Sequence, residues 1–309
     1  MDATIIAGYD SSAEADDAIA LAGWLAQATG AEVVVATAWH HDTFPSRFAV
    51  PSFDNYLRED AEARAREGVE KLPAGVEGRA IAVPGSSAAA GLHDLAEREE
   101  TDLLVVGSTA HGPLGRILLG STGARLIQAS PCAVAVAPRG FATRHNAAPS
   151  VIAVAYDGSP EARTALDHGR ALAEAFGASL RVLTVVEPPD PQTAILASSW
   201  AVAGGYTNAD VHAETRERRR AALDEALEGL PQAVRPSGAL LEGDPATALA
   251  AETQHGVDLL VTGSRGYGPV RRVLLGAVTT GLVRSAACPV LVIPRGAAVK
   301  AAGPVPVHA

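Results

Sequence analysis

The sequence predicts an α/β protein of two similar domains, each a doubly wound parallel sheet with helices on both faces. Three observations lead to this prediction. The chain has 309 residues, about twice the length of a typical domain. TIIAGYDSSAEADDAIALAGWLAQATG returns as VIAVAYDGSPEARTALDHGRALAEAFG, and VVGSTAHGPLGRILLGSTG returns as VTGSRGYGPVRRVLLGAVT. Within each copy, short apolar runs alternate with stretches of helical periodicity, which is typical of parallel α/β sheets.

The repeat sets the expected domain boundaries. Asp10 aligns with Asp157, an offset of 147 (157 − 10), and Gly107 aligns with Gly263, an offset of 156 (263 − 107). The second copy therefore holds nine extra residues (156 − 147), which we expect around residues 188–208. We predict domains at residues 1–140 and 149–296, a linker FATRHNAA between them and a disordered tail at 297–309.

The strands of the first copy are predicted from runs that are apolar throughout, because strands covered on both faces need no polar side. These runs are Thr4–Gly8, Glu32–Ala38, Arg79–Val83, Leu103–Val106 and Ala133–Ala137.

The helix after the first strand is predicted from an apolar stripe at i, i+3, i+4 and i+7. Ser11 with Glu14 is expected to form its capping box, and Gly30 is expected to end it. In the second copy Ser159 and Pro160 fill the corresponding cap and first helical positions. The residues of the stripe are Ala18, Leu21, Ala22 and Leu25.

A second, strongly polar helix is predicted at Asp54–Leu72, matched by Ala209–Leu230 in the second copy. The second of these holds the run RERRR at Arg216–Arg220, with acidic residues at helical spacing around it. Such a pattern is typical of a solvated helix face with ion pairs, and we expect this run to form one.

Composition and charge exclude several function classes. The chain has 25 Lys and Arg against 35 Asp and Glu, a net charge of −10, which argues against a nucleic-acid or anionic-membrane surface. Two cysteines cannot form a disulfide framework. The opening MDATIIAGYD has no basic segment followed by an apolar one, and no run reaches the length of a membrane span. We expect a soluble cytoplasmic protein without a membrane partner.

A phosphate-binding arrangement is predicted where the fourth strand ends. Gly107 closes that strand, and Gly120 with Ser121 opens a helix about a dozen residues later. Backbone N–H groups at a helix N-terminus suit a phosphate, and glycine allows a close approach. Asp10, at the end of the first strand, would lie across the crevice and could accept hydrogen bonds from a ribose or a base. The arrangement favours a nucleotide.

These segments resemble the universal stress protein family, whose domains carry Gly-x2-Gly-x9-Gly-[Ser/Thr] with an Asp at the end of the first strand. The resemblance covers almost the whole chain, twice. It implies flavodoxin-like domains with strand order 3-2-1-4-5, packed about a pseudo-two-fold axis. The two domains are expected to pair through their last strands, Ala133–Ala137 and Leu291–Ile293. It further implies ATP as ligand, with Mg²⁺ possible beside it, a role in a stress or dormancy response, and a homodimer of two chains.

The resemblance also implies a set of nucleotide contacts in each copy. In the first copy they are Gly8, Tyr9, Asp10, Ala38, Val106, Gly107, Thr109, Ala110, Gly120, Ser121 and Thr122. In the second they are Ala155, Tyr156, Asp157, Val185, Thr262, Gly263, Arg265, Gly266, Gly276, Ala277, Val278 and Thr279. For Arg265, a phosphate contact and a solvated side chain both stay open.

Each copy departs from the motif at one place. Ala110 replaces the second glycine of the first copy, which is tolerated unless the position needs a positive φ or backbone contact with phosphate. Ala277 replaces the hydroxyl residue of the second copy and removes a hydrogen bond worth about 0.5–1.5 kcal/mol. Thr279, two residues on, offers partial compensation. We expect both sites to bind, unequally.

Two other functions stay open. One is a nucleotide-free interaction scaffold, favoured by Ala110 and Ala277, and the other is a slow ATPase. No set of candidate nucleophile, base and acid recurs with the repeat, so we predict no catalytic residues, and no metal-ligand cluster is predicted. The sequence leaves open whether ATP is preferred over AMP or a cyclic nucleotide.

Overall fold

The computed structural model describes residues 3–41, 51–108, 121–144, 148–188, 208–264 and 276–294. Several predictions lie outside these residues: the site residues Thr109, Ala110, Gly120, Arg265 and Gly266, most of the expected insertion, and the tail.

The described strands form one sheet across both repeats, in the order β3-β2-β1-β4-β5-β10-β9-β6-β7-β8. The predicted order 3-2-1-4-5 is therefore confirmed in each half. The strands of the first repeat are β1 (Thr4–Gly8), β2 (Glu32–His40), β3 (Gly78–Gly85), β4 (Leu103–Gly107) and β5 (Ala133–Ala137). Those of the second are β6 (Val151–Ala155), β7 (Ser179–Val186), β8 (Ser237–Glu242), β9 (Leu259–Gly263) and β10 (Val290–Ile293).

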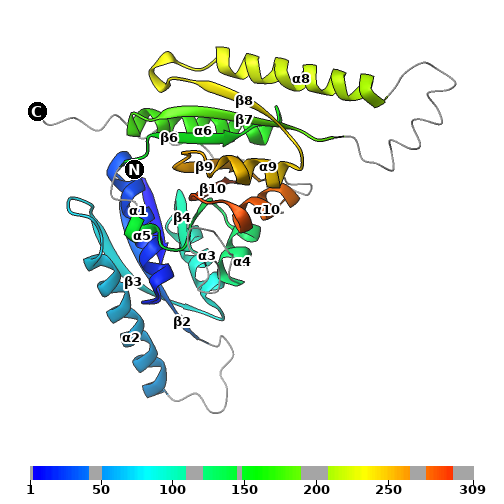
Figure 1. The fold of residues 1–309 in the computed structure, drawn as a ribbon. Coiled ribbons are helices and arrows are strands. Elements are labelled where there is room, and N and C mark those ends of the chain that lie inside the picture. Colours follow the sequence, from blue (N-terminus) through cyan, green and yellow to red (C-terminus); the bar gives the residue numbers. More distant parts are fainter. Residues whose placement is uncertain are drawn as a thin grey trace, which may run out of the picture.

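Helices cover both faces of this sheet (Figure 1). One face is covered by α1 (Ala13–Thr29), α2 (Pro51–Glu70), α5 (Phe141–Arg144), α6 (Pro160–Phe176) and α8 (Asn208–Glu228). The other is covered by α3 (Ala88–Arg98), α4 (Ser121–Ala129), α9 (Pro245–Glu252) and α10 (Ala277–Ser285). A short 3-10 helix, η1 (Gln232–Val234), precedes β8. Each face carries its own hydrophobic core, because alternate residues of every strand point to opposite sides.

The two repeats meet where β5 pairs with β10. Within each repeat the strands are parallel, whereas β5 and β10 run antiparallel, with Leu291 opposite Ala135. The expected pairing of the last strands is confirmed. An antiparallel pair of this kind relates the two halves by an approximate two-fold axis, and it joins both hydrophobic cores across the junction.

The predicted linker begins with packed structure, the short helix α5. Phe141, the first residue of α5, is fully buried, and its ring lies edge-on to Trp24 with centroids 5.7 Å apart. The carboxylate of Asp17 accepts hydrogen bonds from the N–H groups of Gly140 (2.7 Å) and Ala142 (2.8 Å). An acidic side chain of α1 thus caps the linker helix.

The cap of α1 is Ser12, so the predicted cap at Ser11 is wrong. Ser12 accepts a hydrogen bond from the N–H of Ala15, and Gly30 ends the helix in the left-handed region, as predicted. Ser11 itself has a φ of 63°, which a cap residue in extended conformation cannot have. In α6, Ser159 caps the helix and Pro160 is its first residue, as predicted.

Candidate functional site

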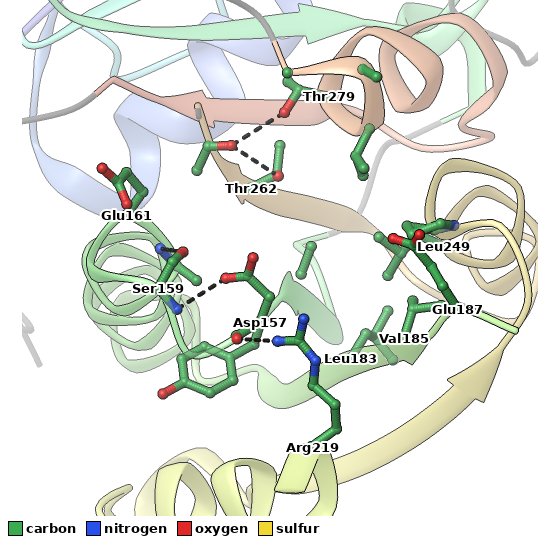
Figure 2. A pocket seen from close by; sticks show the side chains of 18 residues that line it. Asp157, Ser159, Glu161, Leu183, Val185, Glu187, Arg219, Leu249, Thr262 and Thr279 are labelled. Carbon is green, nitrogen blue, oxygen red and sulfur yellow. Dashed lines mark hydrogen bonds between the residues drawn. The ribbon is translucent and has the colours of Figure 1, made fainter. Parts of the chain in front are cut away.

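A cavity of about 300 Å³ opens at the carboxyl edge of the sheet in the second repeat. Its walls come from the ends of β6, β7 and β9 and from the first turns of α6, α9 and α10, with one side chain from α8 (Figure 2). This is the place where the strand order reverses, between β6 and β9, and where open α/β sheets bind ligands. The volume is at the lower end of the range of small-molecule sites.

The structure brings most predicted residues of the second repeat together in this cavity. Arg265 and Gly266 lie outside the described residues. The predicted residues that line the cavity are Ala155, Tyr156, Asp157, Val185, Thr262, Gly263, Gly276, Ala277, Val278 and Thr279.

One end of the cavity is the N-terminus of α10. Gly276 is its cap residue and offers no side-chain acceptor to the first N–H groups of the helix. Ala277 follows without a hydroxyl, so these donors depend on a partner other than the cap side chain. Thr279 is buried here, and its hydroxyl donates to the carbonyl of Gly263 at 3.2 Å. This end suits an anion, because the N–H groups of a helix's first turn and the helix dipole both favour negative charge.

The opposite end of the cavity has an apolar wall. Leu183 and Val185, on β7, and Leu249, on α9, line it. Pockets of this kind hold flat or hydrophobic parts of a ligand and leave orientation to a few polar groups.

Charged side chains stand between and around the two ends. Asp157 lies at the end of β6, and its Oδ1 accepts a hydrogen bond from the N–H of Ser159 at 3.0 Å. Glu161 and Glu187 add two further carboxylates to the lining. Arg219 reaches in from α8 and donates a hydrogen bond to the backbone carbonyl of Asp157.

Arg219 corrects the prediction for the RERRR run. Two members of that run form surface ion pairs as expected, Arg216 with Glu242 on β8 and Arg218 with Glu214 on α8. Arg219 instead turns toward the sheet and lines the cavity. The pattern of charges along the helix could not show this, because it does not tell which side of a polar helix faces a crevice.

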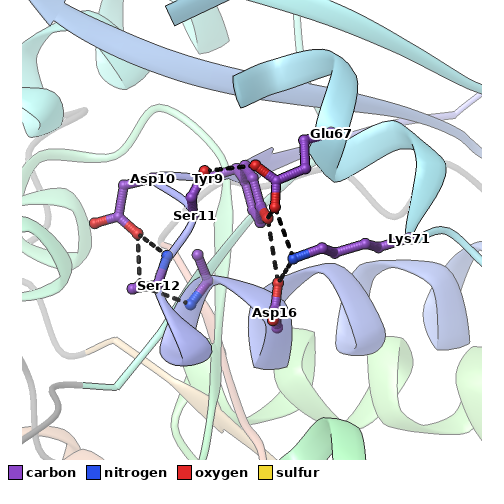
Figure 3. Close-up of polar contacts among 8 residues, drawn as sticks. Tyr9, Asp10, Ser11, Ser12, Asp16, Glu67 and Lys71 are labelled. Carbon is purple, nitrogen blue, oxygen red and sulfur yellow. Dashed lines mark hydrogen bonds and ion pairs between the residues drawn. The ribbon is translucent and has the colours of Figure 1, made fainter. Parts of the chain in front are cut away.

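The first repeat has the equivalent aspartate contact at the end of its first strand, with one added hydrogen bond. Asp10 is exposed, and its Oδ1 accepts hydrogen bonds from the N–H (3.1 Å) and the hydroxyl (2.5 Å) of Ser12 (Figure 3). The predicted residues Gly8, Tyr9, Ala38, Val106, Gly107 and Thr122 lie on the ends of β1, β2 and β4 and at the start of α4. Ser121 is the first residue of α4.

Tyr9 belongs to a polar network between α1 and α2. Its hydroxyl donates to Glu67 at 2.9 Å, and Lys71 forms ion pairs with Asp16 (2.7 Å) and Glu67 (3.0 Å). Burial raises the pKa of Tyr9, while the ammonium of Lys71 lowers the pKa of Glu67. The hydrogen bond to Asp16 raises the pKa of Lys71. The side chain of Tyr9 is thus held in this network, which links α2 to α1 by hydrogen bonds and ion pairs.

The first motif glycine of each repeat has a packing role. A β carbon at Gly107 would lie 1.9 Å from the carbonyl oxygen of Glu14, and one at Gly263 would lie 2.8 Å from that of Glu161. The first turns of α1 and α6 therefore pass too close to β4 and β9 for any side chain. The sequence prediction assigned these glycines to ligand approach, and the structure gives them a reason that needs no ligand.

The two cysteines are buried beside the last strand of each repeat. Burial raises the pKa of the Cys132 thiol to about 11 and raises that of Cys288 as well. Both are neutral at physiological pH, as expected for packing residues rather than nucleophiles.

In the described part of the chain, no three His, Cys, Asp or Glu side chains are grouped so that they could hold a metal ion. Within the same residues, no helix combines the length and the apolar character that crossing a membrane requires.

Comparison with known proteins decides the family. The sequence model of the family described as "Universal stress protein family" matches residues 1–138 and again residues 150–294. The chain belongs to the universal stress protein family.

Relatives of similar length share the tandem arrangement. A universal stress protein of Mycobacterium tuberculosis (strain ATCC 25618 / H37Rv) is 29% identical over 311 residues, which cover 94% of this chain and 99% of that protein. One of Mycolicibacterium smegmatis is 28% identical over 309 residues, covering 94% and 96%. The crystal structure of a universal stress protein from Archaeoglobus fulgidus superposes with a TM-score of 0.68 at 21% identity, covering 95% of this chain and 98% of that one, which supports the fold.

Proposed function

We propose that this universal stress protein binds an adenine nucleotide in each repeat, ATP with Mg²⁺ beside it, and acts as a nucleotide-dependent regulator in a stress or dormancy response. The observation that carries the proposal is the cavity of the second repeat. The N-terminus of α10, which suits an anion, and an apolar wall lie at its two ends, with a carboxylate between them.

Each part of a nucleotide has a matching part of this cavity. The N-terminal N–H groups of α10 would hold phosphate oxygens, since the cap residue Gly276 leaves them without a side-chain acceptor. Asp157 at the end of β6 would accept hydrogen bonds from ribose hydroxyls. The wall of Leu183 and Val185 would take the base.

The proposed role is binding rather than catalysis. Among the described residues, the cysteine thiols are buried and neutral, so neither offers a nucleophile at the cavity. The carboxylates of Asp157, Glu161 and Glu187 line the cavity, but phosphate hydrolysis would need one of them to position a water against the phosphate end. A slow ATPase is the alternative. It predicts phosphate release that disappears in a chain carrying both Gly120→Glu and Gly276→Glu.

Regulation would work through the shared sheet. The ends of β4 and β9 flank the paired strands β5 and β10, so both proposed sites adjoin the junction between the repeats. A ligand that binds one arrangement of the repeats, or of two chains in a homodimer, more tightly than another would shift their populations by that difference in affinity.

The first experiment is the nucleotide content of the purified protein. Protein prepared without added nucleotide is denatured, and the released small molecules are separated by ion-exchange chromatography. Adenine nucleotide in proportion to protein supports the proposal. A lower nucleotide content in a Gly276→Glu variant assigns the missing part to the second repeat. Absence from several gentle preparations favours the second candidate, a nucleotide-free scaffold, for which the missing hydroxyl at Ala277 is the specific observation.

A further inference from the structure

Arg219 is the side chain of α8 that enters the cavity of the second repeat. Its neighbours Arg216 and Arg218 pair with Glu242 and Glu214 at the surface. Arg219 instead donates to the backbone carbonyl of Asp157, and Figure 2 shows its guanidinium beside Asp157 and the wall of β7. A long cationic side chain thus lines a pocket and is held there by a hydrogen bond to the backbone.

The position of Arg219 is the base end of the cavity, away from the phosphate end. Helix α8 packs on β7 and β8. The first turn of α10 instead contacts β9 through the hydrogen bond from Thr279 to Gly263, and β6 lies between β7 and β9. Figure 2 shows Thr262 and Thr279 on one side of the cavity and Arg219 on the other. An arginine that recognised phosphate would be expected near Thr279.

The hydrogen bond of Arg219 engages the edge of its guanidinium and not its flat faces. Guanidinium N–H groups point outward in the plane of the group, so a bond to the Asp157 carbonyl fixes an edge and not a face. A guanidinium held in this way can stack on an aromatic ring, and the adjoining Leu183 and Val185 form an apolar floor for that ring.

We propose that Arg219 stacks on the base of the nucleotide bound in the second repeat and sets the preference of that site for a flat aromatic base. The inference rests on the proposed function and deepens it. It assigns a ligand contact to a helix outside the glycine-rich motif.

In the described part of the first repeat, the position on α2 that is equivalent to Arg219 carries no cationic side chain. The polar helices of the two copies are followed by Pro73 and Pro231, an offset of 158 (231 − 73). At this offset the residue equivalent to Arg219 is Ala61 (219 − 158). The same offset pairs two buried residues, Ala65 and Leu223. Ala61 is itself buried, so the equivalent position of α2 carries only a methyl group toward the core. The two sites are therefore expected to differ in affinity, the second being tighter.

The test compares Arg219→Ala with Arg218→Ala, an exposed cation one position away on the same helix. Both are made in the intact chain and in a Gly120→Glu background intended to silence the first repeat. Adenosine, AMP and ATP are titrated by calorimetry, and urea unfolding checks that both variants fold equally well. Arg219→Ala is expected to weaken all three ligands at the second site by a common factor of about three- to thirtyfold, because the lost contact is to the base. Arg218→Ala should bind as the parent does.

The outcomes separate the two proposals. If the parent binds nucleotide and Arg219→Ala binds it within twofold of the parent, the stacking role is wrong and the proposed function stands. If Arg219→Ala loses more affinity for ATP than for adenosine, Arg219 contacts phosphate, and its assignment to the base end is overturned. If the parent chain binds none of the three ligands, both proposals fail. If the Gly120→Glu variant does not fold, Arg219→Ala and Arg218→Ala are compared in the intact chain, where the tighter and the weaker site are fitted separately.

Discussion

A β carbon at Gly107 would lie 1.9 Å from the backbone carbonyl oxygen of Glu14. The obstacle is backbone, which cannot swing aside as a side chain can. We predict that Gly107→Ala lowers the free energy of unfolding by about 3 kcal/mol, measured by urea denaturation, because the first turn of α1 must move off β4. Gly229→Ala is the control, since its nearest atoms are 3.7 Å away, and it should change stability little. Equal effects of the two variants would contradict the packing role.

Ser11 occupies a left-handed conformation that glycine takes in the other repeat. Its φ is 63°, and Gly158, the aligned residue, has a φ of 82°. We predict that Ser11→Gly raises the free energy of unfolding by about 0.5–1 kcal/mol, because the backbone strain of a residue with a β carbon is removed. Ser12→Ala should lower it by about 1 kcal/mol through loss of the cap. If Ser11→Gly were destabilising, the hydrogen bond from Ser11 to Glu67 would outweigh the strain.

Asp17, which binds the start of the linker, makes the free energy of unfolding depend on pH. Burial raises its pKa above the usual value near 3.8, against the opposing effect of the two N–H donors. The folded protein then holds this proton to higher pH than the unfolded chain, so the contribution of Asp17 to stability falls as pH rises from about 4 through the folded pKa. The free energy of unfolding of the parent minus that of Asp17→Asn should decrease over this range, then level off. A difference that rises with pH would show a lowered pKa.

Ala277 offers a gain-of-function test of the phosphate end. Ala277→Ser restores a hydroxyl at the first residue of α10, next to the uncapped N–H groups. We predict that it tightens ATP binding at the second site by up to about tenfold, the value of one added hydrogen bond. Calorimetry in the Gly120→Glu background measures this, and adenosine, which has no phosphate, serves as the control ligand. An equal gain for adenosine would place the new hydroxyl away from the phosphate.

Much of this fold follows from patterns visible in the sequence. Continuous apolar runs marked the strands, and the sheet order and the β5–β10 pairing match what the family resemblance implied. The cap at Ser12 was also within reach, because aligning it with Ser159 of the second copy gives the correct residue. The local pattern of Ser11 and Glu14 was misleading, since it does not report the sign of φ.

Other features depend on contacts that no local pattern encodes. The closeness of Glu14 to Gly107 arises from how α1 crosses β4, between residues far apart in the chain. Arg219 looked like any member of a charged helix face, and only the packing of α8 on β7 turns it into the cavity. The clamp of Asp17 on Gly140 spans more than a hundred residues, and an acidic residue in a helix does not reveal it.

The most direct test is a calorimetric titration of ATP into the intact chain and into Gly276→Glu, which places a carboxylate where phosphate is proposed to sit. Two equivalents of ATP bound per chain, reduced to one in the variant with unchanged urea stability, is the predicted result. A chain that shows no heat of binding up to millimolar ATP, or a variant that binds like the parent, would contradict the proposed nucleotide site.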